Sequence, residues 1–185
     1  AVESGLAAEI RAVAQRLNVS PAVLFHVAWG LVVARCSGRD DVVFGSVFLG
    51  RMGGVAGADR MQGMFINTLP VRLRLKGVDV LGAMHAMQTV LVDLLKYEQT
   101  SLAQAQRGSG LGSDVALFSA MLNFRHSQVI QEMEGRSGMM IIAARERTNY
   151  PFSVSVDDLG EGFALTAQTQ ARVVEPERVL GYMSC

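Results

Sequence analysis

The chain has 185 residues, of which 50% are hydrophobic and 18% charged, and its 17 basic residues balance its 17 acidic ones. This size and composition suit one domain with a hydrophobic core of its own. A formal net charge of zero disfavours nucleic acid as a partner, because binding a phosphate backbone needs a surplus of Lys and Arg. No apolar run approaches the roughly 20 residues of a membrane span, so we expect no membrane partner either.

Hydrophobic periodicity and turn residues divide the chain into helices and strands. In chain order they predict helices at 4–17 and about 21–36, strands at 42–50 and 63–75, a helix at 80–95, a shorter helical piece near residue 102, strands at 115–124 and 139–144, a hairpin of 150–156 with 162–170, and a helix from 175 that stops after about two turns. Such an order predicts an α/β fold with a mixed sheet covered by helices. Because the last helix is so short, we expect it to be truncated.

Local signals support several of these boundaries. Ser20 suits the N-cap of the second helix, with Pro21 at its first helical position, and Gly38 suits its C-cap. Asp79 is placed to cap the helix at 80–95. The segment 42–50 is apolar on both faces, which is typical of a central strand.

The residues that commonly carry chemistry form no complete catalytic group. Two cysteines, Cys36 and Cys185, make neither a disulfide framework nor a metal site, and they favour a reducing, cytoplasmic compartment. His26 and His85 lie in helical segments without a second ligand nearby, so we interpret them as ordinary helix residues. His126 ends a strand, where catalytic groups often lie, but no carboxylate stands near it in the sequence. The glycine-rich "GSGLG" at 108–112 lacks the strand and helix of a phosphate-binding loop, so we expect a plain loop.

Polar residues interrupt two apolar strand faces. Asn67 shares a face with Leu69, and Ser119 and Asn123 share one with Met121. A buried amide without partners costs about 1–3 kcal/mol. Each of these groups must therefore bond to neighbouring backbone or line a wet cavity, and the pattern by itself leaves both interpretations open.

Several segments in unchanged order, from about Ser20 to the end, resemble the C-terminal half of a nonribosomal peptide synthetase condensation domain. They are "DDVVFGSVFLGR", "MQGMFINTLPVRLRL", "SLAQAQRGSG", "LFSAMLNFRHS" and "TNYPFSVSVDDLGEGFALTAQ". The Gly-x-Phe-x-Asn-Thr core of that family corresponds to "GMFINT", residues 63–68, and Arg72 follows it. The segment before "LFSAMLNFRHS" is often marked by proline in relatives and reads "GSDVA" here, so this chain departs from the family pattern in that loop.

The resemblance implies one lobe of a pseudo-dimer related to chloramphenicol acetyltransferase, with residues 1–185 as its C-terminal lobe. In that family a tunnel runs between the lobes, and an amide forms between a carrier-bound acyl or peptidyl thioester and a carrier-bound aminoacyl acceptor. The catalytic His-His-x-x-x-Asp-Gly signature belongs to the N-terminal lobe and is absent here. We therefore expect no catalytic residue in this lobe, and no activity from it alone.

The expected contribution of this lobe is the wall and floor of the tunnel and part of a carrier-protein docking surface. The residues that the resemblance places along the tunnel are Gly45, Ser46, Gly63, Phe65, Asn67, Ser119 and Asn123. Asn67 would hydrogen-bond a thioester or an amide of the phosphopantetheine arm. Arg51 and Arg72 would tie the lobes together or support the site by pairing with acids, although a plain surface role is equally open.

The resemblance also implies the partners. They are the N-terminal lobe, peptidyl or acyl carrier proteins and a neighbouring adenylation domain, with no cofactor bound directly and the phosphopantetheine arm as substrate carrier. An isolated lobe would expose its inter-lobe face and self-associate through it. Other interpretations are an epimerisation or dual epimerisation and condensation domain, a lobe of a CoA-dependent acyltransferase, and a non-catalytic carrier-binding module.

Overall fold

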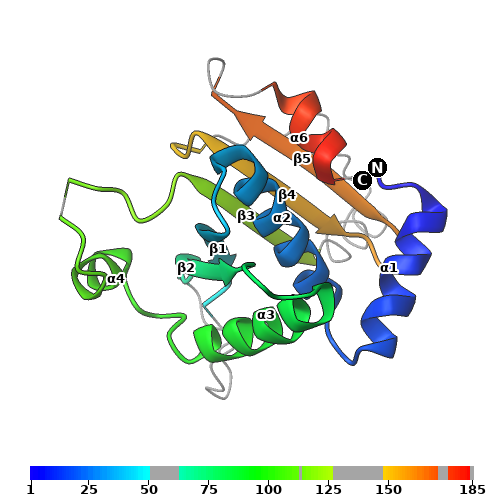
Figure 1. The fold of residues 1–185 in the computed structure, drawn as a ribbon, viewed down its shortest axis with the longest axis horizontal. Helices are drawn as coiled ribbons and strands as arrows, with labels where there is room; N and C mark the ends of the chain where they lie inside the picture. Colours follow the sequence, from blue (N-terminus) through cyan, green and yellow to red (C-terminus); the bar gives the residue numbers. More distant parts are fainter. Residues whose placement is uncertain (51–62, 113, 127–147, 171–174, 184–185) are drawn as a thin grey trace.

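The computed structural model describes residues 1–50, 63–112, 114–126, 148–170 and 175–183 (Figure 1). Its elements follow in the order α1 (Ser4–Arg16), α2 (Pro21–Ser37), β1 (Asp41–Phe48), β2 (Asn67–Arg74), α3 (Val80–Leu95), α4 (Leu102–Gly108), β3 (Ala120–His126), β4 (Phe152–Asp158), β5 (Phe163–Thr169) and α6 (Pro176–Met183). The predicted α/β class is confirmed. The strand expected at 139–144 lies outside the described residues.

The five described strands form one mixed sheet in the order β2-β1-β3-β4-β5. The outer pairs, β1 with β2 and β4 with β5, are antiparallel, whereas β1, β3 and β4 run parallel to one another. The expected hairpin is thus confirmed as β4–β5, with Gly160 at φ 91° in its turn. β1 lies between two neighbours, as its apolar sequence on both faces predicts.

The helix ends follow the local signals. Gly38 ends α2 in the left-handed conformation at φ 66°, and Asp79 caps α3 by accepting a hydrogen bond of 2.7 Å from the backbone N–H of Gly82. Pro21 opens α2 directly after Ser20, but the Ser20 side chain makes no capping hydrogen bond. All three residues therefore lie at the predicted helix ends, but only Gly38 and Asp79 act as caps in the predicted way.

The core lies between the sheet and α2, which crosses the sheet in Figure 1. Alternate strand residues point towards this helix, and Phe44, Val71, Leu122, Val154 and Val156 are fully buried there. Helix α2 comes very close to the sheet at Gly30, where an added Cβ would lie 2.4 Å from the side chain of Leu73. We call this the helix face of the sheet and the opposite side the outer face.

No single described helix is long and apolar enough to cross a membrane; α1 and α2 meet that test only when taken together across a bend of 109°.

Helix α1 is tied to the β4–β5 turn by one arginine. Arg11 Nη2 lies 2.6 Å from Asp158 Oδ1, its Nε donates to the carbonyl of Glu161, and its guanidinium stands 4.3 Å from the ring centre of Phe163. Burial raises the pKa of Asp158, but the hydrogen bonds from Arg11 and from the Gly160 N–H outweigh it and hold that pKa below its usual range. The carboxylate is therefore ionised and paired.

We expect Arg11→Ala to lower the free energy of unfolding by about 2 kcal/mol, because it leaves the buried Asp158 carboxylate without its charged hydrogen-bond donor. The measurement is urea unfolding at neutral pH followed by circular dichroism. Arg16→Ala, at an exposed position on the same helix, is the matched control and should stay within about 0.5 kcal/mol. Equal losses in the two variants would contradict the assigned role of Arg11.

Candidate functional site

The residues expected along the tunnel divide between the two faces of the sheet. Ser46 and Asn67 point to the helix face, in line with Phe44 and Leu69, because they occupy the same alternate positions of β1 and β2. Gly45 and Asn123 belong to the outer face. Arg51 lies outside the described residues. The sequence therefore grouped residues that the sheet separates.

Ser46 is buried and bonded to a histidine. Its Oγ lies 2.8 Å from Nε2 of His26, and Nδ1 of His26 lies 2.6 Å from the carbonyl oxygen of Ala22. Because a carbonyl can only accept, Nδ1 carries the proton and Nε2 accepts from the Ser46 hydroxyl. Ser46 is 2% exposed, and a second lobe would only bury it further. Ser46, expected along the tunnel, thus lies buried on the helix face in this structure.

Burial also fixes the charge of His26. The ring is 3% exposed, and this burial outweighs the hydrogen bond to Ala22 and lowers the pKa of His26 to about 4. At neutral pH the imidazole is uncharged. The Ser46–His26 pair resembles a nucleophile with its base in distance alone, because both side chains are almost fully buried. We assign it to the core.

Gly45 leaves room on the outer face for an aromatic ring. A Cβ at this position would lie 2.4 Å from the nearest ring carbon of Phe118. The Phe118 ring in turn stacks on Tyr150, with ring centres 5.3 Å apart. The chain bends at residues 117 and 119 to bring this ring beneath β1. For this reason β3 begins at Ala120 and not at residue 115 as the sequence pattern predicts.

Two polar residues lie near this aromatic pair along β3. Ser119 is exposed immediately before the strand, and Asn123 is partly buried and opposes Ser155 of β4 in the register. Asn123 shares its face with Met121, as predicted, whereas Ser119 precedes the strand and does not belong to its alternation. The outer face of β3 thus carries both an apolar side chain, Met121, and a polar one, Asn123.

The side-chain amide of Asn67 is hydrogen-bonded to the backbone of a segment that is distant in the sequence. Its Nδ2 donates to the carbonyls of Glu98, at 3.0 Å, and Thr100, at 2.7 Å, and its Oδ1 accepts from the N–H of Thr68 at 2.9 Å. Both amide hydrogens are therefore in use. Of the two interpretations that the sequence left open, the structure has the amide bonded to backbone, so donation to a thioester arm would require one of these bonds to break.

The segment that bonds to Asn67 also contacts the chain directly after β1. Gln99 Nε2 donates to the carbonyl of Gly50, which follows β1 in the left-handed conformation at φ 69°. An added Cβ at Gly50 would collide with the carbonyl of Phe65, so the chain after β1 and the chain before β2 lie side by side here. Gly63 is exposed and Phe65 partly buried. No local pattern pointed to Gln99, because its bond joins residues that are far apart in the chain.

Arg72 pairs with an acid of the neighbouring strand β1. Its Nε and Nη2 contact the two carboxylate oxygens of Asp41 at 2.8 and 2.6 Å. This hydrogen-bonded pair holds the pKa of Asp41 below its usual range, although both side chains are largely exposed. Of the roles left open by the sequence, pairing with an acid is the one that the structure shows for this arginine.

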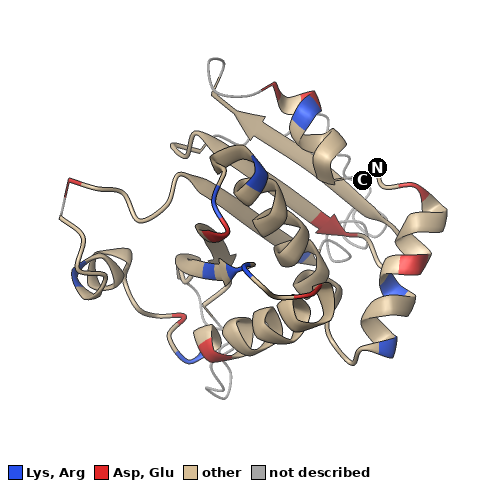
Figure 2. Cartoon of the chain, viewed as in Figure 1, with Lys and Arg blue, Asp and Glu red and all other residues tan. Residues whose placement is uncertain are grey.

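This ion pair borders an open groove of about 1300 Å³ between the outer face of β1–β2 and the segment that contains α4. Its lining residues are Arg39, Asp40, Asp41, Val43, Pro70, Arg72, Arg74, Lys76, Ala105, Gly108, Ser109, Leu111 and Leu117. We call it the α4 groove. Four cations and two acids lie on its β1–β2 side, whereas α3 nearby carries charge only towards its C-terminal end (Figure 2).

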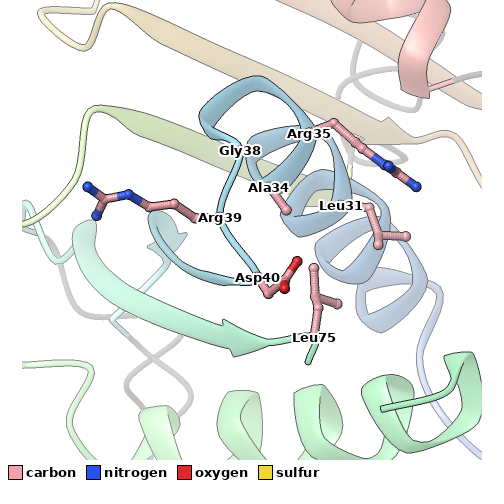
Figure 3. Close-up of a pocket in the computed structure, with 7 residues that line it drawn as sticks. All are labelled: Leu31, Ala34, Arg35, Gly38, Arg39, Asp40 and Leu75. Atoms are coloured by element: carbon pink, nitrogen blue, oxygen red, sulfur yellow. The ribbon is translucent and has the colours of Figure 1, made fainter. Parts of the chain in front are cut away.

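A second hollow, of about 400 Å³, lies beside the C-terminal end of α2. Figure 3 shows the carboxylate of Asp40 and the side chain of Leu75 directed into it, while Arg35 and Arg39 extend away. None of the residues expected along the tunnel lines it. None of them lines the α4 groove either, but Arg72 does, and the groove adjoins the outer face of β1 and β2. We therefore centre the candidate site on the outer face and the α4 groove.

The structure adds a carboxylate that the sequence did not associate with His126. Asp158 Oδ2 lies 3.6 Å from Nδ1 of His126, whose side chain is 76% exposed. The contact joins the ends of β3 and β4, at the edge that Arg11 ties to α1. Among the described residues no group of three or more His, Cys, Asp or Glu could hold a metal ion.

Comparison with known families decides what this lobe is. The family model described as "Condensation domain" matches residues 1–183. This chain belongs to the condensation domain family. The chain is 49% identical over 178 residues to malpibaldin synthetase of Mortierella alpina, covering 94% of this chain and 3% of that protein. It is 34% identical over 157 residues to bacitracin synthase 3 of Bacillus licheniformis, covering 80% of this chain and 2% of that one.

Solved condensation domains share the fold. The condensation domain of the monacolin K polyketide synthase MokA superimposes with a TM-score of 0.79 at 20% identity, covering 99% of this chain and 44% of that one. The first condensation domain of the CDA synthetase gives 0.68 at 15% identity, covering 98% and 42%. The chain thus spans less than half of the condensation domain chains that it matches.

The His26–Ser46 pair makes the stability of this condensation lobe depend on pH. An unfolded histidine titrates near pH 6.5 and the folded one near pH 4, so between these values only the unfolded state takes up the proton. We expect the free energy of unfolding to fall by about 3 kcal/mol as the pH drops from 6.5 to 4. Urea unfolding across this range, with wild type and His26→Gln, measures it.

The exposed His85 on α3 supplies the control for this titration. His85→Gln should keep the wild-type pH dependence, and His26→Gln should lose the part between pH 6.5 and 4 even if it is less stable throughout. The same slope in all three proteins would show that His26 titrates normally.

The close contact between Gly45 and Phe118 predicts that Gly45→Ala lowers the free energy of unfolding by about 2 kcal/mol, because the added methyl group forces the buried ring to move. Gly5→Ala, where an added Cβ would meet nothing within 4 Å, is the control and should leave stability unchanged or slightly raised. Urea midpoints compare the two. An unchanged free energy of unfolding in Gly45→Ala would mean that the Phe118 ring does not pack directly against this glycine.

Proposed function

We propose that this chain is the C-terminal lobe of a condensation domain that joins a carrier-bound acyl or peptidyl donor to a carrier-bound aminoacyl acceptor through an amide bond. The proposal rests on how far each match extends. The family model matches residues 1–183, almost the whole chain, whereas the chain covers 44% of a solved condensation domain chain. This lobe would complete its site with an N-terminal lobe that supplies the histidine signature. Its partners would be carrier proteins and a neighbouring adenylation domain, in the cytoplasm.

In this proposal the outer face of the sheet is the tunnel wall. Its support is the position of Asn123, which lies on β3 on the side of the sheet away from α2, and of the exposed Ser119 immediately before that strand. A serine hydroxyl both donates and accepts, and an asparagine amide does the same with separate atoms. These groups would hydrogen-bond the amide and thioester groups of a phosphopantetheine arm, which is the substrate carrier and not a resident cofactor. Gly63 and Phe65 would border the same wall.

The residues of the helix face would support that wall from behind. Ser46 is joined to His26, and Asn67 to the segment after α3, so both would hold strands in place. Arg72 would keep its pairing with Asp41, and Arg51 would contact the other lobe. The reaction itself needs a neutral amine beside a thioester carbon, and a wall that fixes both arms supplies the proximity, worth up to several kcal/mol of the barrier.

The proposal predicts activity only when both lobes are present. The assay mixes carrier-bound donor and acceptor with this chain, with the separate N-terminal lobe, or with both, and detects the amide product by mass spectrometry. We expect product from the mixture alone. An N-terminal lobe with its signature histidines replaced is the control and should give none.

Two results would count against this proposal. Product from this chain alone would place a catalytic group within these residues, with His126 the first to replace. No product from the mixture, while the undivided two-lobe domain is active on the same substrates, would show that the chain does not complete the site.

A further inference from the structure

Helix α4 forms one side of the α4 groove although packing does little to fix it. It is seven residues long and none of its residues is buried. Its capping box, in which Ser101 and Gln104 bond to each other's backbone N–H, stabilises the helix internally but does not attach it to the lobe. Gln106 of α4 also donates to the carbonyls of Gly112 and Val115, which ties the helix to the segment before β3 and not to β2. Another interaction must therefore set where α4 lies relative to β2.

The attachment lies directly before the helix, in the segment 96–101 that joins α3 to α4. Asn67, at the start of β2, bonds to the carbonyls of Glu98 and Thr100, and Gln99 bonds in the opposite direction to the carbonyl of Gly50. Two side-chain amides thus fasten this segment to the end of β1 and the start of β2. We call this set of three hydrogen bonds the amide clamp.

The amide clamp acts one residue away from the N-cap of α4, Ser101, so any shift in the segment moves the helix. On the far side of the helix, Ala105 and Gly108 line the groove opposite Val43 and Pro70. We propose that Asn67 and Gln99 are positioning residues that hold α4 over β2 and thereby set the width of the α4 groove. The groove joins apolar residues to a rim of four cations and two acids, whose net positive charge suits an elongated ligand with an apolar body and an anionic end.

The functional part of this inference rests on the proposed function, in which an acyl chain on a carrier protein's phosphopantetheine arm is such a ligand, with the phosphodiester of the arm as its anionic end. A wider groove would hold the chain less tightly without altering the reacting groups. The KM for one of the two carrier-bound substrates would then rise while kcat stays the same, because the interaction lost is equal in the ground state and the transition state.

The variants remove donors and preserve shape. Asn67→Asp keeps the acceptor Oδ1 but loses both amide hydrogens, and Gln99→Met keeps the side-chain length without a donor. Gln99→Lys restores a donor of sufficient reach and should rescue. Gln15→Met, which replaces an exposed amide on α1, is the matched control.

The first measurement is hydrogen–deuterium exchange of this chain, read over residues 101–108, together with the urea midpoint. In Asn67→Asp and Gln99→Met we expect exchange at least tenfold faster there, with the core of α2 unchanged. Gln99→Lys and Gln15→Met should match the wild type. Unchanged exchange at 101–108 in both donor-loss variants would overturn the positioning role, and a general increase in exchange would assign these residues to overall stability instead.

The second measurement is steady-state condensation by the complete two-lobe domain carrying the same variants. We expect the KM for one carrier-bound substrate to rise at least fivefold, with kcat within twofold of wild type. Faster exchange without a change in either KM would overturn the role of the groove. A wild-type domain that forms no amide would refute the proposed function, while the exchange experiment would still decide how α4 is held.

Discussion

Strand β1 must meet two different requirements along the same eight residues. One set of alternate side chains packs under α2, where Phe44 is fully buried and Ser46 can be accommodated only because His26 accepts its hydroxyl proton in a hydrogen bond. The other set faces outward, where Gly45 has to be small to admit the ring of Phe118. Both neighbours of β1 pair in the register that this alternation dictates. A shift by one residue would bury the wrong set on each side, so the geometry of the whole candidate site depends on this strand.

Polar groups in this lobe serve mainly to join segments that are distant in sequence. Asn67 with Thr100, Ser46 with His26, and Arg11 with Asp158 each link two different elements. A buried donor or acceptor without a partner costs about 1–3 kcal/mol, so each pair specifies one arrangement of its elements more strongly than apolar contacts do. The family motif around Asn67 therefore has a structural role whatever else it does in the complete domain.

The sequence predicted most of the fold but less of the site, and the difference has a physical cause. Gly38 and Asp79 act within a few residues of their position, and β1 and β2 follow their hydrophobic patterns, so local reasoning succeeds there. Which face of the sheet a residue such as Ser46 adopts depends on the position of α2, which local patterns do not encode. The bend at Phe118 and the bonds of Gln99 arise from contacts across tens of residues, and the start of β3 was wrong for this reason.

The parallel centre of the sheet also sets an order for folding. Helices α1 and α2 and the β4–β5 hairpin join residues that are close in sequence, whereas β1 meets β3 through pairs such as Gly45 with Met121. The chain between Gly45 and Met121 must close into a long loop before these strands can pair, and this closure costs conformational entropy before the contacts between the strands form. During synthesis of this chain, β1 therefore leaves the ribosome well before its partner β3 exists. Until then only β2 can pair with it, and the backbone N–H and C=O groups along its other edge stay without a strand partner.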